Sequence, residues 1–106
     1  MTTAIHNKLV RDKIPNIIIN ANKKPLTRIA SDQEYKKLLQ EKLIEEVNEF
    51  IDSDSVEELA DILEVLKAIS ETKGLTWEEV EKIADDKRNE RGGFKEKIIL
   101  AEVQEK

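Results

Sequence analysis

Two pairs of carboxylates stand at helical spacing in the middle of the chain, and a divalent metal ion is the ligand that such pairs favour. Glu46 and Glu49 form the first pair, and Glu58 and Asp61 form the second. Residues three apart on a helix project from one face, so two antiparallel helices would bring the pairs opposite each other. Oxygen-only ligand sets select Mg²⁺, with Mn²⁺ as a substitute. One histidine and no cysteine argue against a zinc site.

Each acid also has a plainer interpretation as a solvated or capping side chain. The segment from Leu43 to Leu66 holds nine carboxylates and no basic residue, and acidic residues near a helix start already favour the helix dipole. Glu58 favours the metal, because at about 100° per residue it falls inside the apolar arc of its helix, beside Val65. A carboxylate in an apolar face is costly unless it is paired or metal-bound. The alternative is that Glu58 closes a capping box with Ser55.

Basic side chains occur in two places from which they could neutralise phosphate charge. The first is the end of the last predicted helix, where the apolar stripe turns basic at Lys87, Arg88 and Arg91. The second is the N-terminal arm, at Lys8, Arg11 and Lys13. Arginine offers a planar fork that suits phosphate, and lysine offers a point charge. The alternatives are favourable interaction with the helix dipole for the first set and charge-driven docking of the arm for the second.

The charge distribution narrows the classes of function. Residues 1–31 carry six basic side chains and one acid, whereas residues 32–106 carry 12 basic and 22 acidic side chains, for a net charge of −5. The strongly acidic body argues against nucleic-acid binding. No apolar run is long enough to span a membrane, and no signal peptide is recognisable. We therefore expect a cytoplasmic protein with no membrane or nucleic-acid partner.

The hydrophobic periodicity predicts an all-α fold of about four helices in one domain, residues 1–106. Apolar spacing places these helices over residues 12–22, 31–51, 56–72 and 76–91. Capping boxes mark two of the starts, one from Ser31 to Glu34 and one from Thr76 to Glu79. The N-terminal arm and the C-terminal tail are expected to be extended. The result is a small helical bundle that would gain burial by oligomerisation.

These residues together resemble the all-α nucleoside triphosphate pyrophosphatases, the superfamily of MazG-like proteins and phosphoribosyl-ATP pyrophosphohydrolases. The signature of that superfamily, EExxE followed by ExxD, matches Glu45, Glu46 and Glu49 and then Glu58 and Asp61. The segments NKLVRDKIP (residues 7–15) and KRNERGGF (residues 87–94) are similar to a subgroup described as phosphoribosyl-ATP pyrophosphohydrolase-like. Only eight residues separate Glu49 from Glu58, which is fewer than the usual spacer and predicts a tight turn.

The resemblance implies Mg²⁺-dependent hydrolysis of a nucleoside triphosphate between its α and β phosphates, giving a monophosphate and pyrophosphate in a house-cleaning role. It implies that the metal ligands are Glu46, Glu49, Glu58 and Asp61, with Glu45 as a further ligand or a base. It also implies a homodimer or a dimer of dimers. The alternatives are hydrolysis of phosphoribosyl-ATP in histidine biosynthesis and a non-catalytic helical module that binds or regulates a partner.

Overall fold

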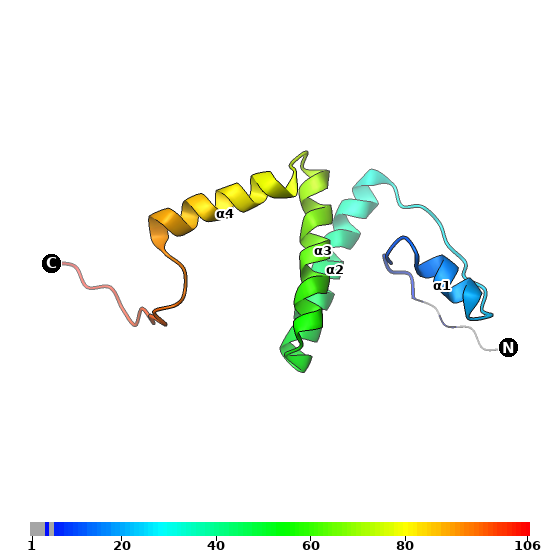
Figure 1. Ribbon diagram of the computed structural model, residues 1–106, viewed down its shortest axis with the longest axis horizontal. Helices are drawn as coiled ribbons and strands as arrows, with labels where there is room; N and C mark the ends of the chain where they lie inside the picture. Colours follow the sequence, from blue (N-terminus) through cyan, green and yellow to red (C-terminus); the bar gives the residue numbers. More distant parts are fainter. Residues whose placement is uncertain (1–3, 5) are drawn as a thin grey trace.

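An antiparallel helical hairpin forms the centre of the computed structural model, which describes residue 4 and residues 6–106. Helix α2 (Asp32–Ser53) and helix α3 (Val56–Thr72) run side by side in opposite directions (Figure 1). Only Asp54 and Ser55 connect them. Asp54 ends α2 with a φ of 54°, a left-handed conformation that a short polar side chain tolerates. The Ser55 hydroxyl then accepts a hydrogen bond from the N–H of Glu57 and starts α3.

The two remaining helices lie on either side of this hairpin (Figure 1). Helix α1 (Ile14–Asn20) has Pro15 in its first turn, where the missing N–H of proline is tolerated. Helix α4 (Trp77–Arg91) begins at the capping box that the sequence predicts between Thr76 and Glu79. It contacts α3 and projects away from the hairpin, whereas α1 packs on no other helix of the described chain.

The all-α class and the four helices are confirmed, and residue 4 and residues 6–106 contain no strand. None of these helices is long and apolar enough to cross a membrane. The predicted capping box at the start of α2 is only half formed. The Ser31 hydroxyl accepts from the N–H of Glu34 at 3.2 Å, but the Glu34 carboxylate accepts two hydrogen bonds from Arg28, at 2.6 and 2.7 Å. A bidentate guanidinium is a stronger partner for this carboxylate than a backbone N–H.

The core of a single chain is small. Leu39 and Val65 are the only apolar residues that are buried among the described residues, and neither is completely buried. The chain exposes 10190 Å² of accessible surface, whereas a compact protein of this mass would expose roughly 6,100 Å². Its radius of gyration is 19.0 Å, against about 13 Å for a compact domain of this length. A large apolar area is therefore left uncovered.

Six exposed apolar side chains form one side of the hairpin, which we call the apolar face. They are Ile44, Val47 and Ile51 on α2 and Val56, Leu59 and Leu63 on α3. At about 100° per residue, each set of three forms one stripe along its helix. The same helical geometry places Glu46 and Asp61 on the opposite side of the α2–α3 contact. The hairpin therefore has an acidic side and an apolar side.

Candidate metal centre

The short turn of the hairpin brings three of the predicted carboxylates together. Glu46 lies two turns before the end of α2, and Glu58 and Asp61 lie in the first two turns of α3. One oxygen from each of the three carboxylates can be chosen so that all lie within 4.8 Å of one another. Ligand oxygens on opposite sides of Mg²⁺ are about 4.2 Å apart, twice the usual metal–oxygen distance. The spacing of the three oxygens is therefore near that of ligands around one ion.

Two oxygens of this cluster are buried without a hydrogen-bond partner among the described residues. They are Oε2 of Glu46 and Oε2 of Glu58. Glu46 is only 7% exposed, in a helix whose other buried residue is Leu39. Buried carboxylate oxygens without partners are unfavourable, and such exceptions call for an explanation. A cation held between them supplies the missing partner, so the residues present fit a divalent metal ion.

The surroundings of Glu58 favour its neutral form when no cation is bound. Burial, as the largest cause, and nearby negative charges together raise the pKa of the Glu58 carboxyl to about 7. The first of these charges is Glu49, followed by Asp61 and Glu46. A cation that enters the cluster would reverse this balance by favouring the carboxylate. The site therefore couples the binding of a cation to the release of a proton.

Glu58 does not close a capping box with Ser55. The N-cap hydroxyl of α3, on Ser55, accepts from the N–H of Glu57, and no capping box forms at this helix start. Asp54 is the C-cap of α2 and has no part in starting α3. The Glu58 side chain is thus free to face Glu46 across the hairpin.

Three cations of the chain itself surround the acids. Arg11 donates to Oδ1 of Asp61 at 2.8 Å, and the Lys8 ammonium lies 3.3 Å from Oε1 of Glu45. The Lys42 ammonium lies 3.6 Å from Glu45 and 3.4 Å from Glu46. The N-terminal arm of the same chain therefore reaches the cluster.

Lys42 is the residue that sequence reasoning missed. Lys42 stands one position before the acid-rich segment from Leu43 to Leu66, which itself contains no basic residue. The signal was present in the spacing, because a lysine four residues before Glu46 lies one helical turn away on the same face.

The remaining predicted residues lie elsewhere. Glu49 is exposed and outside the group of three, although its charge still acts on Glu58. Lys13 is the exposed N-cap of α1, and no ion pair of this residue is found within the described chain.

The basic end of α4 and the acidic cluster do not meet within one chain. Lys87, Arg88 and Arg91 lie on α4, which leaves the far end of α3 and contacts no other helix of the described chain (Figure 1). All three are exposed, and Arg88 is paired with Asp85 on its own helix at 2.7 Å.

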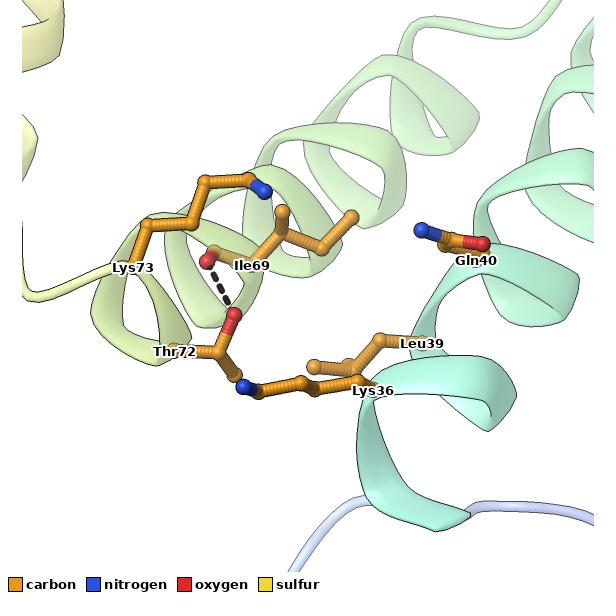
Figure 2. Close-up of a pocket in the computed structure, with 6 residues that line it drawn as sticks. All are labelled: Lys36, Leu39, Gln40, Ile69, Thr72 and Lys73. Carbon is orange, nitrogen blue, oxygen red and sulfur yellow. Dashed lines mark hydrogen bonds between the residues drawn. The ribbon is translucent and has the colours of Figure 1, made fainter. Parts of the chain in front are cut away.

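The hollows of the hairpin are at the end opposite to the acids. One cavity of about 90 Å³ lies between the start of α2 and the end of α3, and Figure 2 shows Leu39 and Ile69 between the side chains of Lys36 and Lys73. A neighbouring open recess of about 320 Å³ shares Lys36 and Thr72 with it. Neither is lined by a residue of the acidic cluster.

Comparison with family models, with curated proteins and with solved structures found no match to this chain.

Proposed function

We propose that this protein is a Mg²⁺-dependent nucleotide pyrophosphohydrolase, which cleaves a nucleoside triphosphate between its α and β phosphates. The observation that supports this most is the convergence of Glu46, Glu58 and Asp61 with two buried oxygens that lack partners. An oxygen-only cluster of this kind suits Mg²⁺ or Mn²⁺. The phosphates of the substrate would complete the coordination, which is the usual way in which proteins use Mg²⁺.

The protein's own residues would hold and orient the reactants. Glu46, Glu58 and Asp61 would bind the metal, which when bound lowers the pKa of a coordinated water and polarises the phosphate oxygens. The water oxygen forms a bond to phosphorus while the bond from that phosphorus to the bridging oxygen breaks, releasing pyrophosphate and a monophosphate. Glu49 is exposed beside the cluster and is placed to accept the proton that the water loses. Glu45 is paired with Lys8 and Lys42 beside the cluster.

We also propose that two copies of the chain associate through the apolar face. The surface that one chain exposes in excess of a compact protein is about 4,000 Å², more than the ~800 Å² per partner that a stable interface needs. Two hairpins joined in this way form a four-helix arrangement whose acidic sides stay open to substrate. In such an assembly α4 of one chain has a hairpin of the other chain to pack on.

A panel of nucleotides tests the activity. Pyrophosphate release is measured with Mg²⁺ for canonical, modified and deoxynucleoside triphosphates and for phosphoribosyl-ATP. We expect release from at least one triphosphate, and loss of at least about 100-fold in Asp61→Asn. Glu64→Gln is the matched control, because Glu64 is an exposed acid on the same helix outside the cluster. Turnover of phosphoribosyl-ATP alone would instead assign the alternative substrate.

Titration with Mg²⁺ separates the enzyme from a non-catalytic helical module. An enzyme of this kind shows a rise in melting temperature and chemical-shift changes at Glu58 and Asp61. If Mg²⁺ produces neither change and no nucleotide is cleaved, the acids are merely solvated and the chain is an interaction module.

A further inference from the structure

The first part of the N-terminal arm lies on the acidic cluster, and two ion pairs connect them. We call residues 6–13 the latch segment. Arg11 binds Asp61, one of the three clustered acids, and Lys8 binds Glu45 on the neighbouring helix. The partners are 50 and 37 residues apart in the sequence, so these are tertiary contacts. They join a segment without helical structure to both helices of the hairpin.

No contact between the described helices reinforces these two ion pairs. The helix that follows it, α1, packs on no other helix of the described chain. The side chains of both ion pairs are between about one third and more than half exposed. Exposed ion pairs of this kind are weak, since water competes for each partner and ordering long side chains is entropically unfavourable. The latch segment is therefore attached by contacts that a stronger cation can replace.

A divalent ion at the cluster competes with these contacts directly. It needs an oxygen of Asp61, the carboxylate to which the Arg11 guanidinium is bound. Its two positive charges would also stand a few ångströms from that guanidinium and repel it. Glu46 and Glu58 contribute buried oxygens that no arm cation reaches, so the small ion has a coordination that Arg11 cannot reproduce.

We propose that the latch segment is released from the hairpin when a divalent metal ion binds. Arg11 and Lys8 pair with Asp61 and Glu45 in the structure; on metal binding, both side chains become free at the edge of the site. This inference rests on the proposed metal centre. The ligand for the freed cations is the phosphate chain of the substrate, which carries the negative charge that they lose when they leave the acids.

Spin labelling tests the release without using activity. The chain has no cysteine, so His6→Cys gives a single labelling position in the latch segment, at an exposed side chain. A nitroxide there is expected to become more mobile as Mg²⁺ alone is added, at fixed ionic strength because ion pairs are screened by salt. A label at Glu102→Cys, in the exposed C-terminal tail, controls for general effects of Mg²⁺.

Calorimetry of Mg²⁺ binding tests the competition. Arg11→Gln is expected to bind Mg²⁺ roughly two- to fivefold more tightly, because the ion no longer displaces a partner of Asp61. Arg28→Gln is the matched control, since Arg28 is bound to Glu34 away from the cluster and its loss leaves the Mg²⁺ affinity unchanged. The midpoint of the mobility change should coincide with the dissociation constant from calorimetry.

Each combination of results either supports or overturns the release of the latch segment. Tight Mg²⁺ binding with an unchanged label, or equal or weaker binding by Arg11→Gln, overturns the release while leaving the metal centre intact. Absence of Mg²⁺ binding in every variant overturns both the release and the proposed function. The label becoming mobile together with tighter binding by Arg11→Gln supports the release.

Discussion

The α2–α3 hairpin and helix α4 both carry charged residues at helical spacing, yet only the hairpin assembles its group within one chain. A two-residue turn and a shared apolar contact bring Glu46 opposite Glu58 and Asp61. Helix α4 follows an equally local turn, but its basic residues stay exposed and distant from the acids. The comparison shows that apolar burial positions a helix, and that attraction between opposite charges does not suffice.

The variant with the largest expected effect on the proposed metal site of the hairpin is Glu46→Gln. We expect loss of Mg²⁺ binding and a fall in activity of at least about 100-fold, because the variant removes a ligand charge. The melting temperature of the metal-free protein should change little, because removing a buried charge with an unpaired oxygen is offset by losing the ion pair with Lys42. Calorimetry and thermal unfolding measure the two effects. The assignment of Glu46 as a ligand is wrong if this variant binds Mg²⁺ as tightly as the natural chain.

The apolar face gives the next largest effect. Leu59→Glu places a charge in the proposed interface between copies, which is unfavourable by several kcal/mol when the charge is buried. We expect the oligomer to dissociate into single chains by light scattering at micromolar concentration. Glu57→Gln, at an exposed position two residues away, should leave the assembly unchanged. A natural chain that is already monomeric at these concentrations would contradict the proposed association.

The basic end of α4 offers a smaller effect that separates binding of substrate from binding of metal. If α4 of one copy completes the site of another, Arg91→Gln raises KM by about tenfold, the loss expected for one charge-assisted hydrogen bond. Its Mg²⁺ affinity should stay the same. Lys82→Gln, on the same helix and paired with Asp86, is the control for a general change in charge. An unchanged KM in Arg91→Gln would confine the site to the hairpin.

The smallest expected effect is a dependence of stability on pH. The pKa of Glu58 in the folded protein is about 7, above its unfolded value of 4.5. The folded state therefore holds more protons than the unfolded state between these pH values. The contribution of the Glu58 carboxyl to the free energy of unfolding is fully present below pH 4.5 and is lost as pH rises through 7. Without metal, the melting temperature should fall between pH 5 and pH 8, and Glu58→Gln should flatten this slope. Saturating Mg²⁺ should oppose the fall, because the ion favours the charged carboxylate.

Much of the local structure was predictable from sequence because it depends on short-range chemistry. The limits of α3 follow from its apolar spacing and from the N-cap residue Ser55. Helix α4 begins at the capping box that Thr76 and Glu79 form. The convergence of Glu46 with Glu58 and Asp61 was predictable for the same reason, since one tight turn and helical periodicity determine it. Glu58 stood out as a carboxylate at an apolar position, and its raised pKa agrees with that position.

The placement of whole segments was not predictable, because it depends on competition between contacts. The Glu34 carboxylate has both a backbone N–H and Arg28 within reach, and the guanidinium forms the bidentate bond. The sequence shows that the arm is basic, but the choice of Asp61 by Arg11 depends on how the chain returns to the hairpin. The direction of α4 likewise depends on the total apolar area that it can bury, which residue spacing does not reveal.

The two-residue turn has a kinetic consequence. The three clustered acids all fall between residues 46 and 61, so only a short loop must close to bring them together. Contacts of such short sequence separation form early in folding. The acids therefore meet and repel one another before the rest of the chain is in place. If the cluster binds Mg²⁺, the ion present during refolding should reduce this repulsion and speed the formation of the hairpin.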